Sequence, residues 1–271
     1  MIQKSPTLIQ KTVVPALNIP GLTPPPQNRN FQGTNNQDAN VDEADLLKND
    51  GTYIYTISGN SLNIILAYPF NFAQKVSHIT LGARPDALFI EGNYLSLFGT
   101  YSNNGDTFTY VLIYDVTNRG NPSLAEEYYF EGSYFNGRKT RDGYVYILST
   151  MRMVSRQIPT PWFDVGNGRR YLSYNDIFFY IGNYQEPLFV NIISFDLRHP
   201  NPDRVRMVSV ITETAQNIYM SFSHIYFTYT DIGTGNLDYT VIHKVFVWRN
   251  FIIPFADAYI RGSIRNQFSL D

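Results

Sequence analysis

The sequence predicts an all-β protein built from repeated four-stranded antiparallel units. Three observations predict it. Tyr and Phe, which favour strands, supply 21 and 19 of the 271 residues. Side-chain types alternate with a period of two in segments such as residues 53–57 and 144–148, which is the strand period. Residues that favour helices, such as Ala, Glu and Lys, are not clustered at helical spacing.

Four units share one layout along the chain. Each has a short strand, a Gly or Asn turn, a Tyr-rich strand, a second turn, a longer strand and an outer strand. The spacing of the first three units matches the roughly 40–50 residue period of propeller blades. The fourth unit comes later because residues 151–186 are inserted between the second and third strands of the third unit. The units span residues 45–81, 86–130, 137–211 and 217–260.

This repetition favours a β-propeller, because radial repetition removes exposed sheet edges. A β-sandwich is the alternative, and it predicts a less regular layout. We expect the blades to occupy residues 34–271, with about four blades and the first strand of a fifth. Residues 1–33 are rich in proline and predict an extended arm, either a tether or a strand-like arm that docks on this protein or a neighbour.

Composition excludes several classes of protein. The net charge of -2 gives no reason to expect a nucleic-acid partner. The chain has no cysteine, and hence no disulfide framework and no thiolate metal site. No window approaches the ~20 apolar residues of a transmembrane helix. We also expect no signal peptide in this chain, because its N-terminus lacks an apolar run of the required length.

The segment NVDEADLLKNDGTYIYTI, residues 40–57, resembles the hallmark V-D-E-x-D-[IL]-[VL]-K-x-D-G-x-Y-I-Y. That hallmark is typical of a family of secreted bacterial and archaeal proteins whose β-propeller domain is distantly related to WD-type repeats. RGSIRNQFSLD, residues 261–271, resembles the family motif G-x-[ILV]-x-N-Q-F-S-[ML]-D. The resemblance covers residues 34–271 and corresponds to the N-terminal half of such proteins. It implies an extracellular or cell-surface location, and it carries no known activity.

Members of that family continue beyond the second motif into further blades, so the resemblance implies an incomplete ring here. A half-ring leaves one face of the first blade and one face of the fourth uncovered. Each exposed Leu-, Ile- or Phe-sized side chain there forgoes about 1.5–3 kcal/mol of burial. Three arrangements relieve this cost: a second chain carries the remaining blades, a homodimer forms an eight-bladed ring, or four blades close alone.

One acidic loop is the densest polar cluster. Its first three oxygen-bearing residues have the i, i+2, i+4 spacing that opens an EF-hand loop. Glu43 replaces the required Gly and Asn49 the bidentate Glu, so the EF-hand interpretation fails. We expect either a Ca²⁺ site of another type, or a loop pinned by carboxylates that accept backbone N–H bonds at the propeller mouth. The candidate ligands are Asp38, Asn40, Asp42 and Asp45.

The insertion at residues 151–186 is the predicted specificity element. It is rich in aromatic residues, and loops on one face of a propeller often carry function. Exposed aromatics there would contact a protein or glycan partner. The alternative is a loop that folds back and buries its own aromatics. The candidate ligand-binding residues are Trp162, Phe163, Tyr171 and Tyr174.

The sequence shows no motif that is specific for a catalytic site. The four histidines show neither HxH nor HExxH spacing, and no GxSxG turn or P-loop occurs. Glu126 and Glu127 are adjacent on a predicted strand and point to opposite faces, unlike a glycosidase pair. The leading hypothesis is a non-catalytic propeller that mediates protein or glycan interaction at a cell or particle exterior. The alternatives are a hydrolase or lyase with a carboxylate site in the central channel, and a structural subunit of a surface layer or virion.

Overall fold

The structure is a computed structural model in which all regular secondary structure is β or single-turn 3-10 helix among the described residues. The all-β prediction is therefore confirmed. No helix in this part of the chain is long and apolar enough to cross a membrane. The predicted arm at residues 1–33, and most of the predicted fifth-blade strand, lie outside the described part. The described residues are 38–103, 105–153, 160–179, 187–213, 215–232 and 238–265.

Blade one is a four-stranded antiparallel meander in the order β2-β3-β4-β5. Its first turn needs Gly51, which has a φ of 87° that other residues rarely adopt. Alternate residues of β3 and β4 point to opposite faces, and one of these faces is mostly buried. The elements are β2 (Leu47–Asn49), β3 (Tyr53–Ser58), β4 (Ser61–Leu66), η1 (Phe70–Phe72) and β5 (Gln74–Thr80).

Blade two has the same meander with two additional short strands at its outer edge, in the order β13-β12-β9-β8-β7-β6. The middle residues of its central strands β7 and β8 are buried, because both faces are covered by neighbouring blades. The elements are β6 (Ala87–Glu91), β7 (Tyr94–Asn103), β8 (Asp106–Asp115), β9 (Ser123–Glu131), β12 (Trp162–Asp164) and β13 (Arg170–Tyr171).

Blade three carries an extra strand at each edge, in the order β1-β10-β11-β15-β16-β14. At the inner edge, β1 pairs antiparallel with β10, and Val41 lies opposite Thr140. At the outer edge, β14 pairs parallel with β16. The elements are β1 (Val41–Glu43), β10 (Ser133–Thr140), β11 (Tyr144–Arg152), η2 (Tyr174–Asp176), β14 (Ile177–Phe179), β15 (Leu188–Asp196), η3 (Pro202–Arg204) and β16 (Arg206–Thr212).

Blade four is again a four-stranded meander, in the order β17-β18-β19-β20. Its register shifts between Lys244 and Val245, where a bulge in the β19–β20 pairing bends the outer strand. The elements are β17 (Asn217–Ser221), β18 (His224–Ile232), β19 (Asp238–Trp248) and β20 (Phe251–Arg261). All four predicted units are thus present as sheets.

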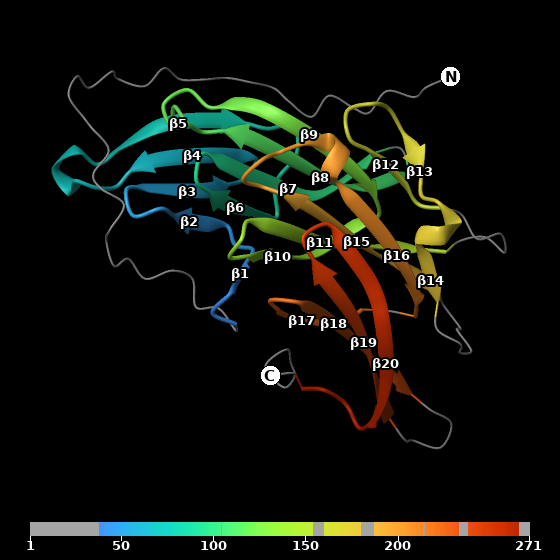
Figure 1. Cartoon of the computed structure of the whole chain (residues 1–271). Helices are drawn as coiled ribbons and strands as arrows, with labels where there is room; N and C mark the ends of the chain where they lie inside the picture. The colour runs from blue at the N-terminus through green and yellow to red at the C-terminus, as the bar shows by residue number, and fades with distance from the viewer. Residues whose placement is uncertain are drawn as a thin grey trace.

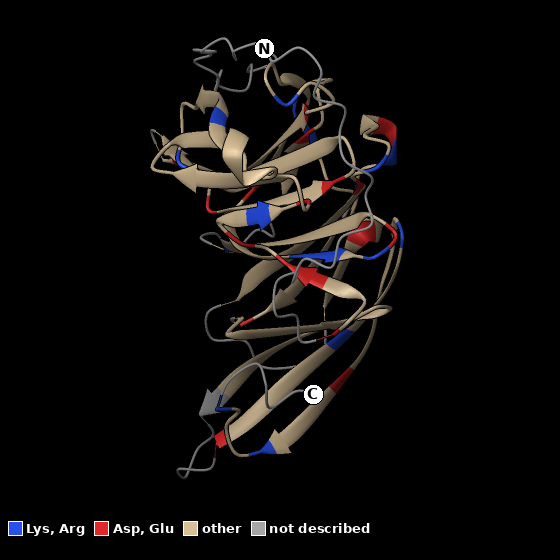
Figure 2. Cartoon of the chain, turned by 90° about the vertical axis from the view of Figure 1, so that its left-hand side faces the viewer, with Lys and Arg blue, Asp and Glu red and all other residues tan. Residues whose placement is uncertain are grey.

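The blades stack face to face, and the described residues form three apolar cores, one at each junction. Figure 2 shows the sheets as successive layers. We call the face that a blade turns toward the next blade its forward face, and the opposite one its rear face. The forward face of blade one packs on blade two through residues such as Tyr55 and Leu97. The same relation joins blade two to blade three and blade three to blade four.

The described blades do not close into a ring. In Figure 1, blade one lies at the left and blade four at the lower right, and blade four does not return to blade one. The expectation of an incomplete ring is therefore met by the described residues. Among the described residues, no further blade packs on the rear face of blade one or on the forward face of blade four, and we call these two faces the free ends of the described stack.

The insertion between β11 and β15 ties two blades together at their outer edges. Its first part forms β12, which pairs with β9 of blade two, and Phe163 lies opposite Phe130. Its later part forms β14 on blade three. Because it is hydrogen-bonded to both sheets, the described part of the insertion is a fixed element of the fold.

Candidate functional site

The acidic loop predicted as a Ca²⁺ site lies beside the inner edge of blade three. Asp38 Oδ1 accepts hydrogen bonds from the backbone N and side-chain Nδ2 of Asn40 at 2.7 and 3.2 Å. Asp42 Oδ1 pairs with Lys48 Nζ at 2.7 Å. Asp45 Oδ1 accepts a bond from the next backbone N–H at 2.6 Å. Each carboxylate thus contacts its own partner. The loop-pinning alternative assigned backbone N–H bonds to Asp42, Glu43 and Asp45, but of these three only Asp45 makes one, because Asp42 pairs with Lys48 and Glu43 with Arg138.

The described residues contain no group of three or more His, Cys, Asp or Glu side chains arranged to hold a metal ion. Calcium binding by this loop stays a prediction that a binding measurement has to test. What the geometry supports directly is a structural role for the loop.

That role is a charged latch between blade one and blade three. Lys48 of blade one is buried, and its Nζ donates to the backbone oxygen of Glu43 at 2.5 Å as well as to Asp42. Arg138 of blade three is also buried, and its Nη2 lies 3.3 Å from Glu43 Oε1. Burial lowers the pKa of the Arg138 guanidinium, and the Glu43 carboxylate opposes this effect. The carboxylates of β1 therefore neutralise two buried cations that would otherwise be costly.

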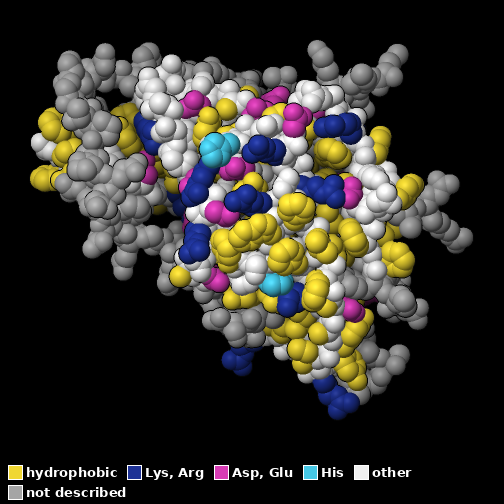
Figure 3. Space-filling model, viewed as in Figure 1, with side chains coloured by type: hydrophobic (Ala, Val, Ile, Leu, Met, Phe, Trp, Pro, Cys, Tyr) yellow, Lys and Arg dark blue, Asp and Glu magenta, His cyan; other side chains and the backbone are white. Residues whose placement is uncertain are grey.

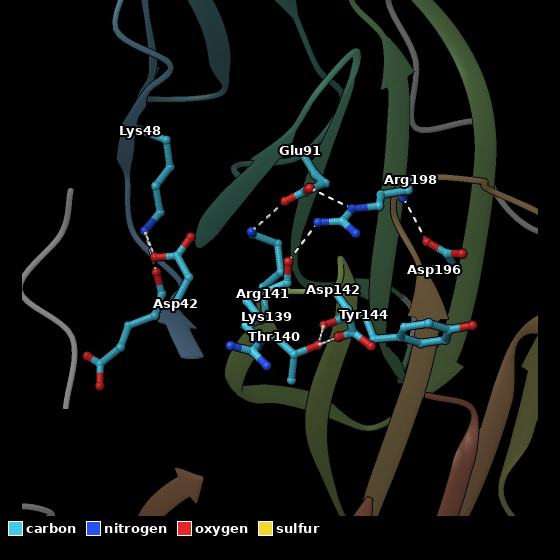
Figure 4. Close-up of polar contacts among 11 residues, drawn as sticks. Asp42, Lys48, Glu91, Lys139, Thr140, Arg141, Asp142, Tyr144, Asp196 and Arg198 are labelled. Atoms are coloured by element: carbon cyan, nitrogen blue, oxygen red, sulfur yellow. Dashed lines mark hydrogen bonds and ion pairs between the residues drawn. The ribbon is translucent and has the colours of Figure 1, made fainter. Parts of the chain in front are cut away.

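A second polar cluster joins blade two to blade three (Figure 4). Glu91 Oε2 lies 2.8 Å from Lys139 Nζ, and its Oε1 lies 2.8 Å from Arg198 Nε. Arg198 also donates to the backbone oxygen of Arg141 at 2.6 Å. Burial alone would raise the pKa of Glu91, but its two cationic partners outweigh burial and hold that pKa below its usual value.

The same kind of contact recurs at the other two junctions. Arg119, in the turn after β8, donates from Nε to the Tyr55 hydroxyl at 3.1 Å, and its Nη2 lies 3.5 Å from Asp50. At the third junction the Tyr146 hydroxyl donates to the backbone oxygen of Arg249, in the turn after β19, at 2.7 Å. At each of the three junctions described, the outer turn of one blade thus contacts residues at or beside the first turn, or on the second strand, of the blade before it.

The insertion buries two of its four predicted ligand-binding aromatics to different degrees. Trp162 is 5% exposed, and its ring packs against Phe108 at a centroid distance of 5.9 Å. The Arg169 guanidinium covers the same ring at 3.8 Å. Phe163 is half-buried, with the Arg170 guanidinium 5.3 Å from its ring. These two residues anchor the insertion, as the fold-back alternative expected.

The other two predicted aromatics point into solvent. Tyr171, on β13, is 66% exposed, and Tyr174, on η2, is 72% exposed. Ser173 lies between them and accepts a hydrogen bond from the Asn175 backbone N–H at 3.3 Å, which caps η2. Three residues span at most about 10 Å, so the two tyrosines occupy one local surface.

The carboxylates considered for hydrolysis lie away from the inner strands. Glu126 and Glu127 are on β9, the fourth strand of blade two, and Glu127 Oε2 accepts a bond from the Tyr129 hydroxyl at 3.3 Å. Burial raises the pKa of Glu126. His224 and His243 lie on paired strands, and His243 is buried against blade three, where its Nε2 lies 3.0 Å from Thr212 Oγ1.

The forward face of blade four is a surface that the sequence did not single out as a site. Figure 3 shows hydrophobic side chains gathered over this blade. The face holds an open hollow of about 300 Å³, in which Lys244 Nζ lies 5.8 Å from the Tyr226 ring. The sequence feature that could have indicated this face is β20, whose segment FIIPFADAYI has apolar residues at both odd and even positions. The hollow is lined by Tyr226, Ile242, Lys244, Ala256, Asp257 and Ala258.

Comparison with known proteins gives one match. A family model described as "Beta propeller domain" matches residues 31–271. No curated protein and no solved structure matches the chain significantly.

Proposed function

The chain belongs to the β-propeller domain family, and from this premise we propose that it is a non-catalytic interaction protein that binds a protein or glycan partner. The proposal rests on one observation: Tyr171 and Tyr174 are exposed on an insertion that is hydrogen-bonded to two blades. Tyr supplies a large contact area with only two side-chain torsions, so it loses little entropy on binding. A fixed backbone lowers the ordering cost further.

The proposed site of action is outside the cytoplasm, at a cell or particle surface. The secreted family that residues 40–57 resemble supports this location. An aromatic surface serves either partner class, because tyrosine rings stack on sugar faces and are enriched in protein interfaces.

The test uses the double variant Tyr171→Ala/Tyr174→Ala and both partner classes. The purified protein is applied to a glycan array, and a photo-crosslinking residue at the neighbouring exposed position 175, present in both the wild type and the double variant, captures protein partners in the source cells. We expect a specific signal in one arm, reduced at least tenfold in the double variant. Phe179→Ala is the matched control, because Phe179 is equally exposed but lies on β14, at the outer edge of blade three. Binding in neither arm, or binding that the double variant retains, contradicts the proposal.

A second candidate function is a structural subunit, as in a surface layer or virion. The specific observation that favours it is the apolar forward face of blade four, because contiguous exposed apolar surface marks contact sites between proteins. A filament or sheet of the purified protein seen by electron microscopy would support this role, and only isolated particles would argue against it.

A further inference from the structure

The forward face of blade four matches the faces that the other blades bury. Tyr55, Tyr146 and Tyr226 are each the third residue of the second strand of their blade. Tyr55 and Tyr146 are fully buried, and the outer turn of the next blade bonds their hydroxyls. Tyr226 instead lines the open hollow. A sheet docked on blade four in the same way would bring its outer turn against Tyr226.

The rear face of blade one is the other free end of the stack. Leu47 is exposed, and the half-buried residues Ile54 and Ile65 lie opposite each other on β3 and β4. Blades two, three and four bury the corresponding rear faces in the junction cores. The outer turn of blade one also differs from the others. It presents Phe70, 84% exposed, and Phe72, 46% exposed, whereas the outer turns of the other blades carry Arg119, Arg198 and Arg249.

The first turn of blade four shows the complementary change. Blades one, two and three have Asp50, Glu91 and Asp142 at or beside their first turns. Blade four has Phe222 there, and its ring packs edge-on against Trp248 at 5.6 Å. Both free ends therefore carry aromatic residues at the positions where the internal junctions carry charged ones. The outer turn of blade one, which carries Phe70 and Phe72, is therefore chemically complementary to the first turn of blade four, which carries Phe222.

We propose that a second copy of this chain docks the rear face of its blade one on the forward face of blade four, head to tail. The docking continues the stacking geometry of the three internal junctions, and it sets Phe70 and Phe72 of one copy beside Phe222 and Trp248 of the other. A head-to-tail contact is heterologous, and in the dimer that we propose two such contacts close the stack into a ring with two-fold symmetry. The contact involves neither Tyr171 nor Tyr174, so it stands apart from the proposed ligand surface.

The first test is the native mass of the purified chain at about 10–100 μM, by non-denaturing mass spectrometry and light scattering. We expect twice the mass of the 31.1 kDa chain. Two variants each disrupt one of the two docking faces. Phe70→Asp/Phe72→Asp charges exposed positions of blade one, and Ala258→Arg fills the hollow on blade four from an exposed position. Each variant should be a monomer, and Tyr171→Asp should stay a dimer. Circular dichroism and thermal melting confirm that the variants fold.

Mixing the two variants gives the sharper result. We expect neither variant to associate with itself. The Ala258→Arg variant retains an intact blade one, and the Phe70→Asp/Phe72→Asp variant retains an intact blade four. The mixture should therefore form a heterodimer through a single junction. A monomeric wild-type protein overturns the proposal, as do two variants that remain dimers. A blade-four variant that is monomeric while the blade-one variant stays dimeric indicates an isologous contact between two blade-four faces, which also overturns it.

Discussion

Lowering the pH should destabilise the fold through one buried histidine on blade four. His243 is on the rear face, 1% exposed, with the Phe227 ring at a centroid distance of 4.8 Å and Thr212 Oγ1 at 3.0 Å. Burial disfavours the imidazolium and lowers the pKa of His243 from 6.5 to about 4, although the Asp257 carboxylate opposes this shift. The folded protein therefore keeps this ring neutral where the unfolded chain protonates it.

The direction of the effect follows from proton binding. Between pH 6.5 and about 4 the unfolded state binds more protons at His243 than the folded state does. The contribution of neutral His243 to the free energy of unfolding is therefore fully present above pH 6.5, and it is lost as the pH drops toward 4. The pKa difference of about 2.5 units corresponds to at most about 3 kcal/mol at roughly 1.36 kcal/mol per unit.

Urea unfolding followed by intrinsic fluorescence, at several pH values between 4 and 7, measures this loss. His243→Gln should be less stable than wild type at pH 7, because it loses the ring packing, but its stability should vary much less across the window. Thr212→Val is the control: it removes the hydrogen-bond partner and keeps the titrating ring, so it should retain the wild-type slope. Parallel pH profiles for wild type and His243→Gln would refute the reasoning.

Three further predictions concern the junctions, one turn and the acidic loop. Glu91→Gln should cost about 1–3 kcal/mol at pH 7, and the difference from wild type in urea unfolding should shrink below pH 4.5, because the folded pKa of Glu91 is depressed. Gly132→Ala should lower the melting temperature more than Gly166→Ala, because both have positive φ but a Cβ at Gly132 would lie 2.6 Å from a backbone oxygen; equal losses would contradict this. If the acidic loop binds calcium, millimolar Ca²⁺ should raise the melting temperature of wild type and not of Asp38→Asn; calorimetry without a shift would reject the site.

The strand pattern was sufficient to predict the blades. Alternation from Tyr53 predicted β3, which the structure places at Tyr53–Ser58, and the matching segment from Tyr144 predicted β11. These patterns are local, because a strand in a stacked sheet has to present one face to each neighbour. The interruption of the third blade was visible for the same reason: its second and third strands are complete, but separated by residues 151–186.

The partners of the extra strands could not be predicted, because no local pattern encodes them. The segment at Val41 was interpreted as a loop, yet it forms β1 and pairs with β10 far along the chain. The sequence also could not predict which aromatic residues of the insertion are buried, because their burial depends on strand pairing. Trp162 and Tyr171 lie opposite each other on β12 and β13. Trp162 is buried because β12 pairs with β9 of blade two, whereas Tyr171 is exposed because β13 is the edge strand of that sheet. Aromatic content predicted the surface, and tertiary pairing decided which residues form it.

The pairing of β1 with blade three also sets an order for biosynthesis. Val41 cannot reach its partner Thr140 until blades one and two and the first strand of blade three have left the ribosome. At roughly 5–20 residues per second, that interval is on the order of ten seconds. During it, Asp42 and Glu43 are without the strand they pair with, and the inner edge of the nascent protein stays open. This long loop therefore closes only after two complete blades have been synthesised, and until then the inner edge is accessible to proteases and chaperones.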